Sequence, residues 1–161
     1  LRDIETMRAA LTAAETGHLV LSTLHTADAT GAVERFVGAF PGGEPGVVRH
    51  RLSLVLKAVV AQQLLPSADG TGRIAVVEIM RVTPAIANLV ASGRTAQIYS
   101  AIESGREIGM QTFDQALAHL ARERLIQTDE GRRLARDPIN FDRLLRQPMR
   151  PATRHERGDN A

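Results

Sequence analysis

The densest group of chemically reactive side chains lies in one short segment, GHLVLSTLHT, at residues 17–26. It holds two histidines and three hydroxyl residues: His18, Ser22, Thr23, His25 and Thr26. The apolar residues between the histidines predict a buried strand over residues 18–25. Such a strand separates the histidines by about 23 Å and places them on opposite faces, so they are not ligands of one metal ion.

His25 and Thr26 fall at the carboxyl end of this strand, where open α/β sheets bind their ligands. A histidine in that position can hydrogen-bond a phosphate. It can also be only a polar residue that ends the strand or caps the next helix. Residue types alone leave both interpretations open.

Other patterns permit chemistry but have simpler explanations. Ser22, His25 and Asp28 have the residue types of a catalytic triad, but no nucleophile elbow surrounds the serine and a buried strand denies it substrate. Glu78 is the one charge within RIAVVEIM, so it is a candidate catalytic carboxylate, although a strand-end or edge position is the commoner explanation. The arginine-rich residues 132–157 could contact nucleic-acid phosphates, but interspersed acidic residues favour a solvated face and no nucleic-acid partner.

The composition removes several classes of site. With no cysteine in 161 residues, disulfide frameworks, thiolate metal sites and cysteine nucleophiles are excluded. Lys57 is the only lysine among 20 basic residues, and it lies in LVLKAVV, not in a G-x-x-x-x-G-K-[ST] phosphate-binding loop. No apolar run approaches the ~20 residues that cross a bilayer, so we expect no membrane insertion.

Apolar periodicity and capping residues predict the elements that position these groups. We expect helices from Asp3 to Gly17 and from Asp28 to the Pro41-Gly42-Gly43 break, each with its aspartate as the N-cap. Further elements are expected as a long helix over 47–64, a strand over 73–80, a helix over 84–91, and short helices around 98–105, 112–125, 130 onward and 141–145. A disordered tail is expected from Pro148.

The order of these elements indicates an α/β protein with parallel strands, followed by a small helical subdomain. Two strands cannot form a stable sheet core alone. We therefore expect further strands to lie before Leu1 or to come from a partner chain. The absence of an initiator methionine supports a beginning within a domain.

Several segments, taken together and in order, resemble one known family. They are LRDIETMRAALTAAETGHLVLSTLHT, AVERFVGAFP, IAVVEIMRVTPAIANLV, QIYSAIESGREIGMQTFDQAL and PINFDRLL. These segments closely resemble the twitching-motility (PilT) family, the hexameric secretion-superfamily ATPases that power type IV pilus retraction. The resemblance covers about residues 1–147 and is far more specific than any single motif.

The resemblance implies roles for the first residues. Leu1-Arg2-Asp3 matches the end of the Walker B segment, whose usual form is G-E-[ML]-R-D. The glutamate that polarises the attacking water is therefore expected just before Leu1. Arg2 is implied as a catalytic residue and Asp3 as a cofactor-binding residue.

Residues 18–26 match the His box of the family. By this resemblance His25 approaches the γ-phosphate of ATP and His18 supports the site, both as catalytic residues, while Thr26 is implied as cofactor-binding. No residue of the chain is assigned as a metal ligand. The strand-end argument favours His25 over His18 independently of the resemblance.

Two departures from related patterns bear on the branch of the family. TPAIANLV is similar to the A-I-R-N-L motif associated with retraction and with contacts within the hexamer, but Ala87 stands where arginine is usual. Extension ATPases of pilus assembly and type II secretion usually carry a tetracysteine insertion after the long helix. AQQLLPSADGTGR has no cysteine, which favours the retraction branch.

The resemblance thus implies the distal part of a RecA-type P-loop NTPase core at residues 1–82, a helical C-terminal subdomain at 83–147 and a tail at 148–161. The intact protein is expected to be a homo-hexameric ATPase using ATP and Mg²⁺ to retract type IV pili. It would act at the cytoplasmic face of the inner membrane on the pilus platform protein. We expect this chain alone to be inactive; the alternative is a non-enzymatic interaction module or the remnant of a split gene.

Overall fold

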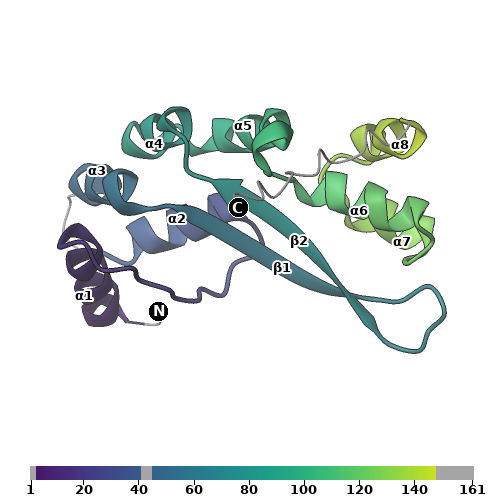
Figure 1. Cartoon of the computed structure of the whole chain (residues 1–161), viewed down its shortest axis with the longest axis horizontal. Helices are drawn as coiled ribbons and strands as arrows, with labels where there is room; N and C mark the ends of the chain where they lie inside the picture. The colour runs from purple at the N-terminus through teal and green to yellow at the C-terminus, as the bar shows by residue number, and fades with distance from the viewer. Residues whose placement is uncertain (1–2, 41–44, 148–161) are drawn as a thin grey trace, which may run out of the picture.

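The computed structural model describes residues 3–40 and 45–147. Figure 1 shows α1, α2 and α3 around one end of a long two-stranded hairpin, with α6, α7 and α8 grouped farther along it. The elements are α1 (Ile4–Glu15), α2 (Ala29–Gly38), α3 (Pro45–Val55), β1 (Ala58–Pro66), β2 (Arg73–Arg81), α4 (Pro84–Ala91), η1 (Thr95–Gln97), α5 (Ile98–Ser104), η2 (Arg106–Ile108), α6 (Phe113–Arg122), α7 (Thr128–Leu134) and α8 (Pro138–Arg146).

The helix starts expected from capping residues are confirmed. The side chains of Asp3, Asp28 and Thr83 accept backbone N–H groups in the first turns of α1, α2 and α4. Thr112 and Gln115 form both hydrogen bonds of a capping box at the start of α6. Polar caps were readable from the sequence because each satisfies local amides that the helix itself leaves unpaired.

The long helix expected over residues 47–64 is wrong. The structure ends α3 at Val55 and begins β1 at Ala58. Within β1 the buried residues are Ala61 and Leu65, and a spacing of four fits one face of a strand as well as one face of a helix. The apolar pattern therefore did not separate the two structures here.

The expectation of parallel strands is also wrong for β1 and β2, the two strands that the described residues form. β1 and β2 are antiparallel and paired over their full length, from Ala58 opposite Arg81 to Pro66 opposite Arg73. Only residues 67–72 join them, and a parallel pair needs a crossover connection of a dozen or more residues. The predicted strand over residues 73–80 is confirmed as β2.

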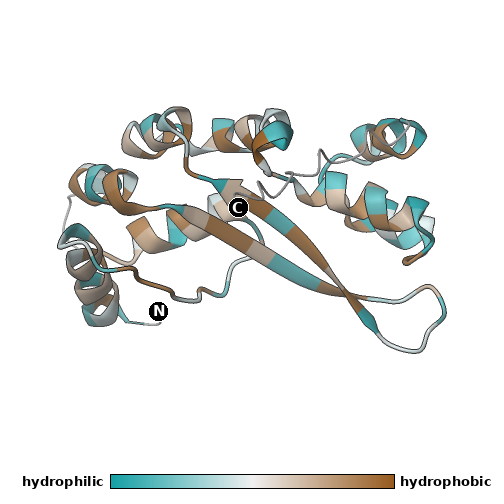
Figure 2. Ribbon diagram, viewed as in Figure 1, coloured by the Kyte–Doolittle hydropathy of each residue, from teal (hydrophilic) through white to brown (hydrophobic). Residues whose placement is uncertain are grey.

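The strand expected over residues 18–25 does not form among the described residues. This segment is extended in outline but pairs with no strand, and Leu19 and Leu21 are 83% and 87% exposed. Figure 2 shows its apolar stretch lying apart from the hairpin. The sheet of the described residues consists of β1 and β2 alone, and residues 18–25 are not part of it.

The apolar core consists of two clusters that share β2. In the first cluster Met80 packs with residues from α1 to α5 and with Met110. In the second, Val76 packs with residues of α6 and α8 and with Ala61 and Leu65 of β1. The predicted division of the chain at residues 82 and 83 stays a prediction, and α4 and α5 pack in the same cluster as α1, α2 and α3.

The short C-terminal helices agree with expectation as α5, α6, α7 and α8, and α4 runs from Pro84 to Ala91 as expected. The expected tail from Pro148 and the Pro41-Gly42-Gly43 break lie outside the described residues. Within residues 3–40 and 45–147, no helix is both long enough and apolar enough to cross a membrane.

The hairpin turn carries an exposed carboxylate that its own loop holds. Asp69 accepts the hydroxyl of Ser67 at 2.5 Å and the backbone N–H of Thr71 at 3.0 Å. The Ser67 hydroxyl, with the Thr71 N–H second, lowers the pKa of Asp69 from 3.8 to about 2. Ser67 also closes the turn through its backbone N–H, which donates to the carbonyl of Gly72.

We predict that Asp69→Ala destabilises the hairpin above pH 4 and that this effect shrinks as the pH falls. The depressed pKa means that the stabilisation is present above the unfolded value of 3.8 and is lost as pH falls through about 2. Free energies of unfolding of both proteins between pH 2 and 7 measure this. Asp69→Asn is the control, since it keeps an acceptor oxygen without titrating; a pH-independent difference between wild type and Asp69→Ala would contradict the prediction.

Candidate functional site

The segment from residue 18 to residue 26 leads from α1 into α2 and presents His25 at the surface. His25 is exposed and Thr26 is half-buried. Two residues later Asp28 caps α2, its Oδ1 accepting the N–H of Gly31 at 2.6 Å. The start of α2 therefore fixes the C-terminal end of the segment, and His25 lies three residues before that cap.

His18 lies at the other end of the segment, against the end of α1. Its Nδ1 is 3.1 Å from Thr16 Oγ1 and 3.3 Å from the carbonyl oxygen of Ala13. Its backbone N–H also donates to that carbonyl, at 3.0 Å. His18 thus helps to satisfy a C-terminal carbonyl of α1, and the predicted supporting role at a phosphate stays a prediction.

The two residues implied at the start of the chain differ in what can be said of them. Arg2 lies outside the described residues. Asp3 is exposed and serves α1, with Oδ1 accepting the N–H of Thr6 at 2.8 Å and Oδ2 accepting its hydroxyl at 2.9 Å. The backbone N–H of Thr6, and then its hydroxyl, lower the pKa of Asp3. Asp3 is therefore ionised and already engaged at neutral pH.

Two of the predicted site residues, Asp3 and His18, lie apart in the described chain. Asp3 and His18 flank opposite ends of α1, whose 12 residues span about 18 Å. No hydrogen bond or ion pair joins His25 to either of them in residues 3–40 and 45–147. The same part of the chain holds no group of three histidine or acidic residues placed for a metal ion.

The start of α2 does not offer a cradle for a phosphate. The N–H of Ala29 donates to Glu78 Oε1 at 2.8 Å, and that of Gly31 donates to Asp28. Carboxylates therefore already occupy the amides that would otherwise attract an anion. Lys57 is exposed at the start of the hairpin, outside any glycine-rich loop. The start of α2 and Lys57 therefore do not form a nucleotide site by themselves, and the predicted role of His25 at a phosphate stays a prediction.

Glu78 is the residue whose role sequence analysis missed. It is 2% exposed, and its two oxygens accept the N–H of Ala29 at 2.8 Å and the N–H of Phe113 at 3.4 Å. An edge position does not explain it, because β2 pairs with β1 on one side and bridges to Gln111 on the other through Ile79. Burial raises the pKa of Glu78, and the two backbone N–H groups oppose that rise.

The signal that could have identified this role was the isolation of Glu78 in an apolar strand. A buried carboxylate must find hydrogen-bond donors, and the first-turn amides of helices are the donors that a fold leaves over. Asp114 is also fully buried and finds backbone donors just before a helix: its oxygens accept the N–H groups of Arg136 at 2.8 Å and of Asp137, the N-cap of α8, at 3.0 Å. These bonds tie α6 to the start of α8.

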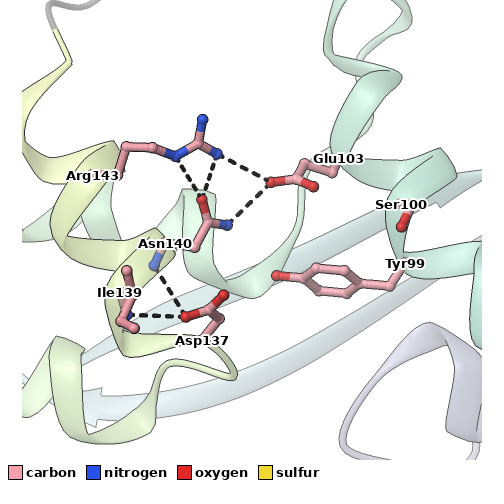
Figure 3. A pocket seen from close by; sticks show the side chains of 7 residues that line it. All are labelled: Tyr99, Ser100, Glu103, Asp137, Ile139, Asn140 and Arg143. Atoms are coloured by element: carbon pink, nitrogen blue, oxygen red, sulfur yellow. Dashed lines mark hydrogen bonds and ion pairs between the residues drawn. The ribbon is translucent and has the colours of Figure 1, made fainter.

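A hollow of about 450 Å³ lies between α5 and α8. Figure 3 shows its polar residues bonding to one another: Asn140 Nδ2 donates to Glu103 Oε1 at 3.1 Å, and Arg143 Nε donates to Asn140 Oδ1 at 3.1 Å. None of the residues predicted for phosphate chemistry lines it. The hydrogen bonds across this hollow connect α8 to α5.

Several arginines of the C-terminal region are paired with carboxylates, as expected for a solvated face. The pairs are Arg132 with Asp142, Arg133 with Glu130, and Arg143 with Glu103. Neighbouring acidic groups thus compensate much of the positive charge that a nucleic acid would need.

The chain is similar in sequence to bacterial proteins of known function. Type IV pilus retraction ATPase PilT of Pseudomonas aeruginosa is 48% identical over 141 residues, which are 88% of this chain and 41% of that protein. A twitching motility protein of Neisseria gonorrhoeae is 48% identical over 137 residues, 85% of this chain and 37% of that protein. The chain thus spans about two fifths of the length of these relatives.

Solved structures and a family model agree with this. A crystal structure of the pilus retraction motor PilT with bound ADP matches with a TM-score of 0.77 and 37% identity, covering 89% of this chain and 40% of that one. The Legionella pneumophila ATPase DotB matches with a TM-score of 0.70 and 25% identity, covering 83% and 36%. These matches confirm the expected α/β class and the resemblance to PilT. Since the model of the Type II/IV secretion system proteins matches residues 1–133, the chain belongs to that family.

Proposed function

We propose that this chain is the C-terminal part of an ATPase motor that drives retraction of type IV pili. The observation that carries the proposal is the 48% identity with PilT over 88% of the chain. The exposed position of His25, directly before the capped start of α2, supports it. The bound ADP in the matching PilT structure supports a nucleotide as the ligand of the complete site.

In the proposed motor this chain supplies residues that respond to a nucleotide held elsewhere. Bound ATP with Mg²⁺ provides the phosphoryl group whose hydrolysis releases free energy. With ATP bound, His25 would donate a hydrogen bond to the transferred phosphoryl oxygens, where added donors stabilise the developing charge. His18 and Thr26 support the same segment, and Arg2 and Asp3 act at the Walker B end.

The open side of the hairpin supports completion of the core by further strands. β1 carries exposed Val60 and Leu64, and the segment of residues 18–26 carries exposed Leu19 and Leu21. Apolar groups of this kind become stable when a neighbouring strand covers them. We place the complete protein in a homo-hexamer at the cytoplasmic face of the inner membrane, acting on the pilus platform protein.

This chain alone should not hydrolyse ATP. It has no phosphate-binding lysine loop, and the first-turn amides of α2 are occupied by carboxylates. We expect phosphate release from ATP and Mg²⁺ to be equal for the purified chain and its His25→Ala variant, at the level of the buffer. A rate in the unsubstituted chain that His25→Ala abolishes would contradict this.

A chimera tests the proposed motor function directly. We would join the preceding region of Pseudomonas aeruginosa PilT to residues 1–147 of this chain and measure ATP hydrolysis. We expect a hexameric, active enzyme whose kcat falls about a hundredfold or more with His25→Ala, as loss of one charge-stabilising donor does elsewhere.

The matched control is His119→Ala, because His119 is an exposed histidine on α6 that the proposal gives no role. It should leave kcat unchanged. A well-folded chimera without ATPase activity, or one in which both substitutions have equal effects, would favour the interaction-module alternative. Reading the coding sequence upstream of Leu1 adds an independent test: an in-frame G-x-x-x-x-G-K-[ST] supports the motor, and a stop codon opposes it.

A further inference from the structure

Glu78 lies between two helices that belong to different parts of the core. α2 packs in the first apolar cluster through Val33 and Phe36, whereas α6 packs in the second through Leu117. β2 contributes to both clusters, and Glu78 is in this strand between Val76 and Met80. The carboxylate is thus positioned where the two clusters meet.

Each oxygen of Glu78 serves a different helix. Oε1 accepts from Ala29, the first residue of α2, and Oε2 accepts from Phe113, the first residue of α6. First-turn amides have no partner inside their own helix, and the N-terminal ends of both helices favour a negative charge. Both helices therefore depend on the same side chain for one amide each.

The two bonds are unequal. The bond to Ala29 is 2.8 Å long and that to Phe113 is 3.4 Å, so the contact with α6 is the weaker one. α2 is also held by Asp28, and α6 by the capping box of Thr112 and Gln115. Each helix start is therefore held both by a local cap and by Glu78.

Both helices lead to parts of the chain that would move with them. Ala29 follows His25 by four residues, so the start of α2 determines where His25 lies. On the other side, Asp114 in α6 holds the backbone of Arg136 and Asp137 at the start of α8. Two buried carboxylates, Glu78 and Asp114, thus connect the segment of His25 to α8 through hydrogen bonds to backbone amides.

We infer that Glu78 is a positioning residue that couples the His25 segment to the C-terminal helices, so that a displacement at one is felt at the other. Its role in ATP hydrolysis rests on the proposed function, but the coupling between α2 and α6 is a property of this chain itself. The partner sites are the amides of Ala29 and Phe113.

The first experiment measures amide hydrogen exchange by NMR in the complete 161-residue chain. Glutamine has one acceptor oxygen, so Glu78→Gln cannot accept both N–H groups. We expect exchange of the Phe113 amide to accelerate about tenfold, as expected for one lost hydrogen bond, with a smaller change at Ala29. Asp69→Asn is the control: the Asp69 carboxylate accepts only from Ser67 and Thr71 within the hairpin turn, so exchange at Phe113 and Ala29 should stay unchanged.

The second experiment tests coupling and does not require Glu78→Gln to fold. Gln115→Ala removes half of the capping box of α6, since Gln115 Oε1 accepts the N–H of Thr112 at 3.0 Å. With Glu78 in place, we expect exchange at Ala29 to accelerate about threefold or more, although α2 is untouched. In the double variant with Glu78→Gln, Gln115→Ala should add nothing at Ala29. An unchanged Ala29 amide in the single variant Gln115→Ala would overturn the inference.

The PilT chimera then links the coupling to the motor. We expect Glu78→Gln to lower kcat about tenfold and to leave the Kd for ATP unchanged, because the residue does not contact nucleotide. A rise in Kd with unchanged kcat would overturn the positioning role. If the chimera is inactive while Gln115→Ala still affects Ala29, the proposed function fails and the coupling stands; the reverse result rejects the coupling alone.

Discussion

The fold depends on one constraint: a carboxylate buried in the middle of an apolar strand must find hydrogen-bond donors. Glu78 finds them at the first residues of α2 and α6, which fixes where both helices begin relative to β2. Hydrogen bonds to a charged group contribute about 1.5–3 kcal/mol each, whereas burial of an ion costs several kcal/mol. The arrangement therefore adds little net stability and mainly specifies geometry, since few placements of two helices satisfy one carboxylate.

The antiparallel hairpin links the placement of α2 and α6 to both apolar clusters, because β2 contributes to each of them. β2 places Met80 in one apolar cluster and Val76 in the other, so both halves of the core rest on a single stiff element. Helices that pack on different clusters meet through polar contacts, at Glu78 between α2 and α6 and where Asn140 of α8 donates to Glu103 of α5. Apolar packing tolerates small slides of one surface on another, but a bond to a particular amide does not. The polar contacts consequently define the relative position of helices that apolar contacts merely hold together.

Sequence analysis succeeded where a structure is set by neighbours along the chain. The caps at Asp3, Asp28 and Thr83 and the box at Thr112 were predictable because donor and acceptor lie within three residues. It failed where contacts are distant. The apolar spacing in residues 58–66 fits a strand and a helix equally, and only pairing with β2 decides between them. Glu78 acts over 49 and 35 residues of sequence, a relation that no local pattern encodes.

The segment of residues 18–26, which carries His25, shows the same dependence on distant contacts at the predicted site. Its apolar residues suit a strand, yet Leu19 and Leu21 stay exposed, because strand structure belongs to a pair and not to one segment. The end nearest α2 is held by Asp28 directly and by Glu78 through Ala29. The position of His25 is therefore set from its C-terminal side, by residues that lie far along the chain. If α2 began at another position relative to β2, the same segment would have the same residue types, but His25 would lie elsewhere.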